Sequence, residues 1–221
     1  MAKGKTGLKY DYYLCDFDGT IADTGEGIRR SVAWALERLG RPALPEATLN
    51  RFIGPPLHDT YVELFGMTDA IAEHAIEVYR ERYLKIGLFE SELYPGIAAL
   101  LKALREGGAY VAVASAKPQF MLERASAHFG IDGFLHAIAG VGLDRHAADK
   151  QDLILRALPE GADRSRAVMA GDRLYDIEAA KALGLTAVGA DYGYSLPGEL
   201  EGAGADVVFD DPLAMARWLL E

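Results

Sequence analysis

The sequence predicts an α/β fold: a parallel β-sheet covered by helices and interrupted, after its first strand, by a helical insert. Short apolar runs, each ending at a turn or a polar cluster, mark expected strands at residues 12–17, 110–115, 167–172 and 186–191. Segments with helical spacing separate the later runs. Short strands that are continuously apolar, rather than alternating, are expected where helices cover both faces of a parallel sheet.

The alternation of strand and helix continues through the C-terminal part of the chain. Apolar residues at helical spacing predict helices around residues 97–104 and 177–183. Two weaker apolar runs, at residues 135–140 and 205–210, indicate two further strands. The result is a regular succession of strand, helix and strand, which favours a parallel sheet.

Residues 24–94 follow a different pattern, without a convincing strand. Apolar residues recur at the spacing of one helical face over residues 28–39 and again from Ile71 to Tyr83. Gly40 and Gly87 are suited to end these two helices. The expected domains are an α/β core formed by residues 1–23 and 95–221 and a helical cap domain formed by residues 24–94.

Composition and charge exclude several classes of protein. Of the 221 residues, half are apolar and a quarter are charged, which is typical of globular proteins, and the net charge is −10. A protein that binds the nucleic-acid backbone needs a basic face, so we expect no nucleic-acid polymer as a partner. A polyanionic protein can still act on a small phosphate if a divalent cation and one or two lysines reverse the local field.

Cysteine content and hydropathy indicate the compartment. The single cysteine, Cys15, excludes an internal disulfide and a cysteine-rich metal site, and it fits a reducing environment. The first residues carry lysines but no apolar run of signal-peptide length, and no segment approaches the length needed to cross a membrane. We therefore expect a cytoplasmic protein that does not bind membranes and is a monomer or a homodimer.

Polar side chains close three of the expected strands. They are Asp16 and Asp18 after the first strand, Ser115 at the end of the second, and Asp172 followed by Asp176 after the third. Ligands of parallel α/β sheets bind beyond the carboxyl ends of the strands, so we expect these side chains at one edge of the sheet. Like charges that lie so close raise each other's pKa unless a cation lies among them, and Mg²⁺ prefers oxygen ligands. The set therefore predicts a magnesium site.

These motifs resemble those of a known family. The stretch "DFDGTIADT" resembles the DxDGT motif of the haloacid dehalogenase superfamily of phosphatases. Ser115 in "VAVASAKP" matches the second motif of that family, Lys150 in "AADKQDLIL" the third, and "GDRLYDIEAAKALG" the acidic fourth. The resemblance extends from Tyr12 to about Tyr194. It implies a Rossmann-like parallel sheet with an inserted helical cap.

The resemblance also implies a chemical role for each acidic residue. Asp16 would be the nucleophile that attacks phosphorus and forms an aspartyl-phosphate. Asp18 would protonate the leaving oxygen and then activate the water that hydrolyses this intermediate. Mg²⁺ would be held by Asp16, by the main-chain carbonyl of Asp18 and by Asp172, with Asp176 binding directly or through water.

Phosphate binding is assigned by the same resemblance. Ser115 and Lys150 would bind the phosphoryl oxygens and belong to the catalytic set, together with main-chain N–H groups that follow the nucleophile. Gly19 and Ala116 lie beside motif residues, and we assign them to substrate binding.

Simpler roles are expected for other polar residues near the motifs. Lys117 and Arg173 lie beside motif residues and are candidates for holding phosphate, but solvated side chains are the better interpretation of both. Lys150, judged without the family, is equally well explained as a solvated lysine at the start of a helix. Cys15 is flanked by apolar residues and is expected to be a buried, unreactive side chain.

The cap is expected to close over the site and to recognise the leaving group. The candidate loop is "NRFIGPPLHDTY" at residues 50–61, in which Gly54 and the two prolines after it force a rigid, non-helical bend. Arg51 carries a guanidinium that suits a phosphate or a carboxylate, although a surface position explains it nearly as well. Arg51 and Gly54 complete the predicted substrate-binding residues.

Within the superfamily, the chain looks most like the phosphoglycolate phosphatase-like subfamily. The "FIGPPL" loop resembles that of its 5′-nucleotidase-like and pyrophosphatase-like branches. The chain departs from the common pattern in having Gln151 instead of proline after Lys150 and Ser115-Ala116 instead of Thr-Ser. Neither change removes a required chemical group. Asp18 argues against C–halogen hydrolysis, because the dehalogenases of the superfamily lack that aspartate.

The sequence thus predicts a Mg²⁺-dependent phosphatase that hydrolyses a small phosphomonoester, such as phosphoglycolate or a nucleotide, through an aspartyl-phosphate. The alternatives are a sugar phosphomutase of the β-phosphoglucomutase type, an inorganic pyrophosphatase, and a non-catalytic protein that binds phosphate. The expected partner is a small phosphorylated metabolite. Similar caps serve glycolate, nucleotide and sugar phosphates, so the sequence does not rank these substrates.

Overall fold

A computed structural model describes residues 7–142 and 149–221. In this part of the chain, six parallel strands form one sheet in the order β5-β4-β1-β6-β7-β8. The strands are β1 (Tyr12–Cys15), β4 (Tyr110–Pro118), β5 (Ala137–Val141), β6 (Ala167–Gly171), β7 (Thr186–Ala190) and β8 (Val207–Phe209). All six overlap the regions predicted to be strands; β4 extends three residues beyond its predicted end and β5 one residue. The predicted α/β fold class is confirmed.

The order of the strands determines where a ligand can bind. Strand β1 lies between β4 and β6, with Cys15 opposite Val113 on one side and Ala170 on the other. The chain first builds outward from β1 through β4 and β5, and then crosses back to β6 and builds in the opposite direction. Open α/β sheets bind ligands at such a reversal, beyond the carboxyl ends of the strands. The residues that directly follow β1 therefore lie at the expected binding edge.

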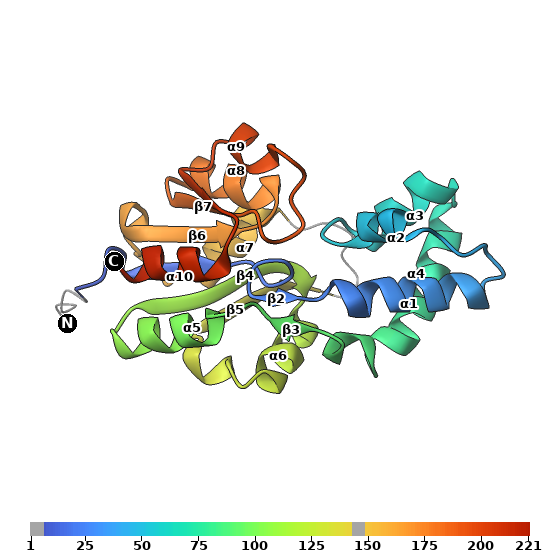
Figure 1. Cartoon of the computed structure of the whole chain (residues 1–221), viewed down its shortest axis with the longest axis horizontal. Coiled ribbons are helices and arrows are strands. Elements are labelled where there is room, and N and C mark those ends of the chain that lie inside the picture. Colours follow the sequence, from blue (N-terminus) through green and yellow to red (C-terminus); the bar gives the residue numbers. More distant parts are fainter. Residues whose placement is uncertain (1–6, 143–148) are drawn as a thin grey trace.

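Helices cover both faces of the sheet, which explains why its strands are apolar on both sides. In β1, Leu14 contributes to the apolar cluster on one face, and Tyr13 and Cys15 contribute to the cluster on the other. The first face is covered by α7 (Lys150–Ala157), α8 (Leu174–Leu183) and α9 (Glu199–Gly202), and the second by α5 (Ile97–Glu106), α6 (Gln119–His128) and α10 (Pro212–Leu220) (Figure 1). Burial on both faces leaves the strand ends as the place for polar residues.

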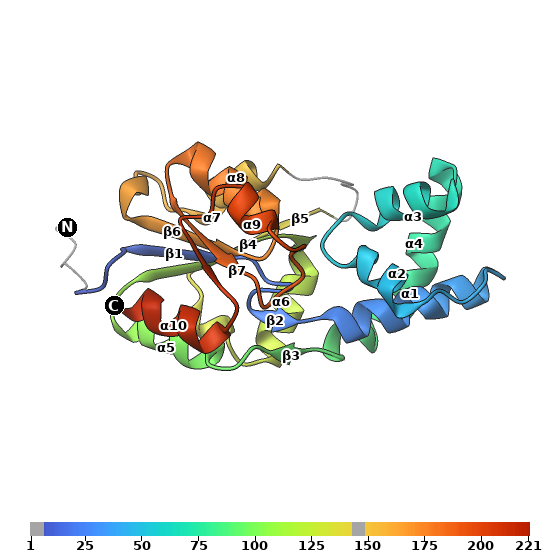
Figure 2. The same cartoon turned by 45° about the horizontal axis from the view of Figure 1, so that its top comes forward.

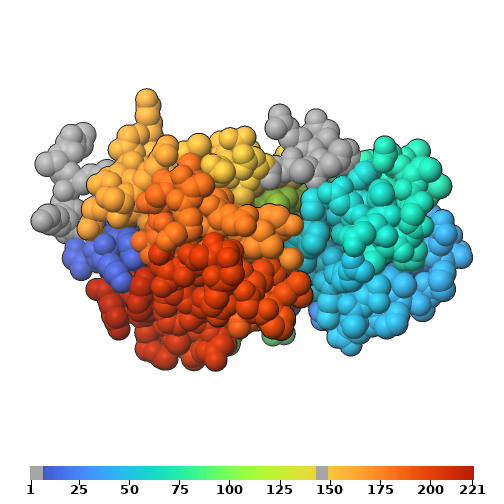
Figure 3. Space-filling model, turned by 90° about the horizontal axis from the view of Figure 1, so that it is seen from above, coloured from blue at the N-terminus to red at the C-terminus, as the bar shows by residue number. Residues whose placement is uncertain are grey.

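A second group of helices lies beside the sheet. It consists of α1 (Gly25–Arg38), α2 (Glu46–Leu49), α3 (Leu57–Phe65) and α4 (Asp69–Tyr83), with the 3₁₀ helix η1 (Asn50–Phe52) between α2 and α3. Figure 2 shows these helices grouped at one end of the molecule, and Figure 3 shows them as a lobe beside the core. Helices α1 and α4 pack together through the apolar faces that the sequence predicts, with Val32, Ala35, Ala75 and Tyr79 buried. Three further 3₁₀ helices are η2 (Gly87–Phe89), η3 (Asp132–Phe134) and η4 (Arg164–Arg166).

The connection between the two groups differs from the prediction. Strands β2 (Ala22–Asp23) and β3 (Glu92–Leu93) pair antiparallel where the chain passes to the helical group and back. No strand was expected in residues 24–94, and β3 shows that this prediction was wrong. A strand of two residues is too short to produce the apolar run from which the other strands were predicted. Ile71 is 44% exposed and does not belong to the buried face of α4. Gly87 begins η2 instead of ending α4, which already ends at Tyr83.

Two other expectations concern single features. Cys15 is buried, as expected, and this burial raises the pKa of its thiol to about 12, so the thiol stays protonated at neutral pH. Among the described residues, no helix combines the length and the apolar character that crossing a membrane requires. Cellular location and oligomeric state stay predictions.

Helix α1 approaches η2 so closely that only glycine fits at the contact. A Cβ atom on Gly27 would lie 1.9 Å from the carbonyl oxygen of Gly87, and the Gly27 N–H donates to the carbonyl of Glu90 at 3.0 Å. The atom that a Cβ on Gly27 would meet belongs to the main chain, so a change of side-chain rotamer cannot relieve the clash. This contact fixes α1 against the segment that leads back to the sheet.

We expect Gly27→Ala to lower the free energy of unfolding by about 1–3 kcal/mol, because the added methyl group overpacks a contact between backbones. Chemical denaturation measures the change. The matched control is Gly133→Ala, where a Cβ atom meets nothing within 4 Å, and it should change the free energy by less than about 0.5 kcal/mol. Equal effects of the two substitutions would contradict the prediction.

Candidate active site

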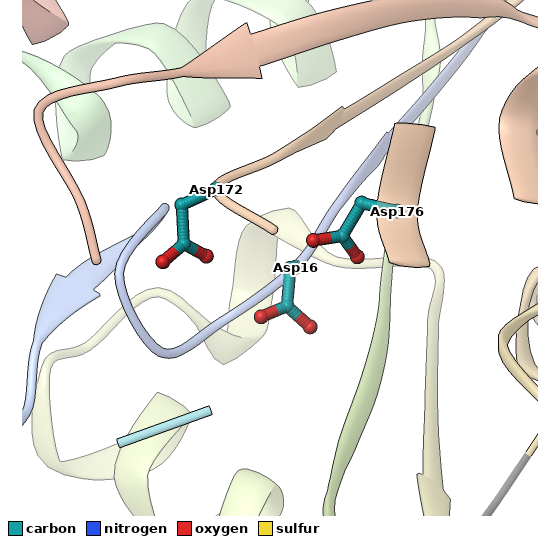
Figure 4. Close-up of side chains that lie close together, drawn as sticks. All are labelled: Asp16, Asp172 and Asp176. Atoms are coloured by element: carbon teal, nitrogen blue, oxygen red, sulfur yellow. The ribbon is translucent and has the colours of Figure 1, made fainter. Parts of the chain in front are cut away.

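Three carboxylates meet at the carboxyl ends of β1 and β6. Asp16 directly follows β1, Asp172 directly follows β6, and Asp176 lies in the first turn of α8. One oxygen from each lies within 4.8 Å of the others, and all three residues are buried (Figure 4). The strand register and the short turn from β6 into α8 therefore bring together three of the four acidic residues that the sequence predicts, and the fourth, Asp18, is not part of this cluster.

The protein environment opposes negative charge at this cluster. Burial raises the pKa of Asp16 to about 6, and the charges of Asp176 and Asp18 add to the shift, while Lys150 opposes it. The pKa of Asp172 is raised well above its ordinary value, first by burial and then by Asp16 and Asp176. Without a further cation, the charged forms of Asp16 and Asp172 are therefore less favoured than those of ordinary exposed carboxyls.

Lys150 supplies one positive charge to the cluster. It is the first residue of α7, which Asp149 caps by accepting a hydrogen bond from the Gln151 N–H at 2.9 Å. Its Nζ lies 2.7 Å from Asp16 Oδ1 and 2.5 Å from Asp176 Oδ1, and its side chain is 10% exposed. The structure thus places Lys150 with the acidic residues rather than in solvent.

A second lysine pairs with the other predicted acid. Lys117 Nζ donates to Asp18 Oδ1 at 2.8 Å, to Asp18 Oδ2 at 3.0 Å and to Tyr83 Oη at 2.7 Å. Burial opposes the charge on Lys117, but Asp18 and Tyr83 outweigh it and raise the pKa of the ammonium group. The prediction of a solvated Lys117 is therefore wrong. The signal was present, because Ser115 and Lys117 are two residues apart on a strand and lie on one side of it.

Asp172 is held in place by the loops around it. Thr20 Oγ1 donates to Asp172 Oδ1 at 3.2 Å, and the main-chain N–H of Tyr194 donates to Asp172 Oδ2 at 2.9 Å. A Cβ atom on Gly19, whose φ is +82°, would lie 2.1 Å from Asp172 Oδ2. The N–H of Gly19 donates to Ala22 O at 2.9 Å, so it is engaged within its own loop instead of facing a substrate. The structure thus gives Gly19 a role in packing against Asp172, and its predicted substrate contact gains no support.

Tyr194 also reaches the start of the helical group. Its hydroxyl accepts from the N–H groups of Thr24 at 3.0 Å and Gly25 at 2.7 Å, and it donates to Asp23 Oδ1 at 2.5 Å. One residue therefore bonds to an acidic residue of the cluster through its main chain and to the first turn of α1 through its side chain. No periodic pattern or motif in the sequence indicates this contact.

A cavity of about 700 Å³ opens at the acidic cluster. The core contributes the predicted residues Asp16, Asp18, Ser115, Ala116, Lys150, Asp172 and Asp176 to its lining. The helical group contributes Phe52, Gly54, Pro55, Pro56, Leu57 and His58 from the predicted loop, and Ile76, Tyr79, Arg80 and Tyr83 from α4. The structure therefore places most of the predicted site residues around one space, between the core and the helical group.

Two arginines near the cavity differ from their predicted placement. Arg51 does not line the cavity; its guanidinium lies 2.5 Å from Glu63 Oε1, and its side chain is 50% exposed. Glu63, on α3, is thus the partner of the guanidinium that we assigned to the substrate. Arg173, expected in solvent, is paired with Glu199 at 2.9 Å and donates to the carbonyl of Ile53 at 3.4 Å. Arg173 links α8 to the loop of residues 50–61, a contact that sequence proximity does not reveal.

Comparison with known proteins identifies the family of this chain. The model of the haloacid dehalogenase-like hydrolase family matches residues 13–190. The chain belongs to this family. The superfamily resemblance seen in the sequence motifs is therefore confirmed.

Individual relatives of this haloacid dehalogenase-like hydrolase are similar over most of the chain. A protein of Pseudomonas aeruginosa named 5′-nucleotidase is 38% identical, and the match covers 97% of each chain. The tyrosine-protein kinase PtkA of Mycobacterium tuberculosis is 37% identical over 82% of this chain and 62% of its own length. The crystal structure of a predicted phosphatase from Clostridium acetobutylicum superposes with a TM-score of 0.87, is 33% identical, and covers 96% of this chain and 98% of its own.

We expect Asp172→Asn to stabilise the metal-free protein, by on the order of 1–3 kcal/mol at pH 7. A carboxyl with a raised pKa holds more protons when folded than when unfolded. The wild type therefore loses stability as pH rises from the ordinary carboxyl range near 4 through the raised pKa values, which include about 6 for Asp16. An amide at residue 172 can bond Thr20 and Tyr194 without adding charge.

Urea unfolding in EDTA at several pH values between 4 and 8 measures this effect. The gain from Asp172→Asn should be small at pH 4 and grow toward pH 7. The control is Asp132→Asn, at an exposed position of η3. A variant that is less stable than the wild type at pH 7, or a difference that does not change with pH, would show that repulsion within the cluster is unimportant.

Proposed function

We propose that this chain is a Mg²⁺-dependent phosphatase that hydrolyses a phosphomonoester through an aspartyl-phosphate on Asp16. The observation that carries the proposal is the buried cluster of Asp16, Asp172 and Asp176, which borders a cavity together with Asp18 and Lys150. Structural carboxylates are seldom buried together without enough compensating charge. A site with this charge pattern suits a reaction in which a cation and a phosphate both bind.

The donor set fits Mg²⁺. The cluster offers hard oxygen ligands from Asp16, Asp172 and Asp176. Burial raises the pKa of Asp16 and Asp172, and a bound cation would lower both pKa values again. These residues would hold the ion, with the main-chain carbonyl of Asp18 as the family motifs suggest. When bound, Mg²⁺ would offset the repulsion between the phosphate and the carboxylates.

The residues of the chain account for both halves of the reaction. Asp16 attacks phosphorus while the bond from phosphorus to the leaving oxygen breaks, and that oxygen takes the proton of Asp18. The carboxylate left on Asp18 then accepts a proton from water, the water attacks the same phosphorus, and Asp16 is released with inorganic phosphate. Lys150 Nζ, 2.7 Å from Asp16 Oδ1, favours the charged nucleophile. Lys150 and the Ser115 hydroxyl would bind phosphoryl oxygens, and both line the cavity at the acidic cluster.

The cavity favours a leaving group larger than glycolate, and we infer that the substrate is a nucleoside monophosphate. Phe52, Ile76, Tyr79 and Met121 give the space of about 700 Å³ apolar and aromatic walls. Such walls suit the faces of a base and a sugar, whereas glycolate would fill little of the space. The name of the relative from Pseudomonas aeruginosa, 5′-nucleotidase, points to the same class.

We also propose that residues 24–94 act as a cap over this cavity, with the core formed by residues 1–23 and 95–221. Residues of the helical group line the side of the cavity across from the acidic cluster, which supports this role. A cap of this kind excludes water while the phosphoryl group moves and contacts the leaving group. We expect the protein to act in the cytoplasm on a small phosphorylated metabolite.

Phosphate release from a substrate panel tests the proposal. The panel holds nucleoside monophosphates, 2-phosphoglycolate, sugar phosphates, pyrophosphate and p-nitrophenyl phosphate, each with Mg²⁺ and with EDTA. We expect Mg²⁺-dependent release, fastest from a nucleoside monophosphate, and a loss of about 10³-fold or more in Asp16→Asn because the nucleophile is removed. Asp132→Asn is the matched control.

The other outcomes of the panel separate the alternatives. Preference for pyrophosphate, or interconversion of sugar phosphates without phosphate release, would favour the pyrophosphatase or the phosphomutase. Transfer of phosphate to a tyrosine would favour the activity named for PtkA. Absence of turnover with every compound would contradict the phosphatase.

Metal binding is tested separately from turnover. We expect Mg²⁺ to raise the Tm of the wild type, since a ligand at 100 times its Kd adds about 2.7 kcal/mol to the stability of the folded state. The shift should be largely lost in Asp172→Asn and kept in Asp132→Asn. Equal shifts in all three proteins would mean that Mg²⁺ binds elsewhere.

A further inference from the structure

Lys117 has no role in the reaction described above, although it is paired with Asp18, the proposed acid and base. Lys117 lies near the end of β4, and its side chain is only 4% exposed. Its ammonium group lies beside the ring of Tyr83, at 5.2 Å from the ring centroid, and 5.9 Å from that of Phe17. A lysine is seldom buried to this degree unless it is paired, so its partner is the first clue to its function.

The three donors of the Lys117 ammonium group are all in use. Two N–H···O contacts go to the two oxygens of Asp18, at 2.8 and 3.0 Å, and one goes to Tyr83 Oη, at 2.7 Å. An ammonium group has three N–H donors and no acceptor. Lys117 therefore has no donor left for a phosphate unless it releases Asp18 or Tyr83. Lys150 differs, because its contacts are to Asp16 and Asp176.

We propose that Lys117, held in place by Tyr83, is the positioning residue that orients the Asp18 carboxyl group for proton transfer to the leaving oxygen. This inference rests on the proposed role of Asp18 as the general acid and base. Asp18 follows β1 in a loop, and its side chain is 17% exposed at the cavity, so it needs an anchor to keep one orientation. Lys117 provides the anchor from a rigid strand.

The second half of the anchor comes from the helical group. Tyr83 is the last residue of α4, it is buried, and its ring stacks on that of Tyr79 with centroids 5.0 Å apart. Its hydroxyl is the third contact of the Lys117 ammonium group. The core therefore supplies the acid and the lysine, and the helical group supplies the hydroxyl that fixes the lysine. The geometry of proton transfer depends on α4 being docked against the core.

The first test compares two classes of leaving group. An alkoxide must be protonated as it leaves, whereas p-nitrophenolate leaves without a proton, so a misplaced acid slows the alkyl ester more. The measured quantity is the single-turnover rate of leaving-group release, because the later hydrolysis of the aspartyl-phosphate is common to all esters. We expect Lys117→Met to lower this rate about 10²-fold for the best alkyl ester of the panel, to lower it much less for p-nitrophenyl phosphate, and to leave KM within about threefold. Lys102→Met, an exposed lysine of α5, is the matched control.

Tyr83→Phe is the second variant, because it removes only the hydroxyl and keeps the ring packed on Tyr79. It should show the same preference for p-nitrophenyl phosphate, with a smaller loss in the single-turnover rate of leaving-group release. If Lys117→Met does not fold, as judged by its Tm, this variant decides. A Tyr83→Phe protein with equal losses for both esters, or with none, would overturn the proposal.

A double-mutant cycle distinguishes positioning from direct phosphate binding. If Lys117 acts through Asp18, then Lys117→Met combined with Asp18→Asn turns over the alkyl ester as slowly as Asp18→Asn alone. If the losses multiply, or if Lys117→Met raises KM for every ester, then Lys117 contacts phosphate and the inference is wrong. Full activity of Lys117→Met beside an impaired Asp18→Asn overturns this inference alone. Full activity of Asp18→Asn would overturn the proposed role of Asp18, and this inference with it.

Discussion

The compensation of buried negative charge at the ends of two neighbouring strands governs this structure. Asp16 and Asp172 follow β1 and β6, which hydrogen-bond to each other in the middle of the sheet, so the pairing of the strands holds the main chain of these two residues close together. Lys150 offsets part of this charge, and the cavity leaves room for the rest of the compensation to come from bound ligands. The protein alone therefore leaves part of the negative charge uncompensated, as expected of a binding site before its ligands bind.

The two lysines give different surroundings to the carboxylates of Asp16 and Asp18, which are only two residues apart in sequence. Lys150 contacts Asp16, and Lys117 contacts Asp18. The proposed chemistry asks Asp16 to attack phosphorus and Asp18 to carry a proton, and different charged partners contribute to the different surroundings that such roles require. The lysines come from different elements, α7 and β4, so each environment is set independently.

Sequence reasoning was most successful where a chemical requirement coincides with a pattern. The strands were found because burial on both faces makes them apolar, and the acidic residues because they end those strands. Lys117 was missed although it lies two residues after Ser115 on the same predicted strand, a spacing that places side chains on one side of a strand. Tyr83 gave no separate signal, because its hydroxyl extends from a residue of an apolar stripe. Arg51 was chosen for its chemistry alone, and its partner Glu63 comes from tertiary packing.

The position of Tyr194 has a thermodynamic consequence. Its main chain bonds to Asp172, and its hydroxyl bonds to the N–H groups of Thr24 and Gly25 at the start of α1. A movement of that first turn displaces Tyr194, which orients the Asp172 carboxylate. A movement of the carboxylate displaces the first turn through the same residue. Linkage makes the two effects equal in free energy. Whatever factor a given orientation of α1 adds to the affinity for a cation, the cation adds the same factor to the preference for that orientation.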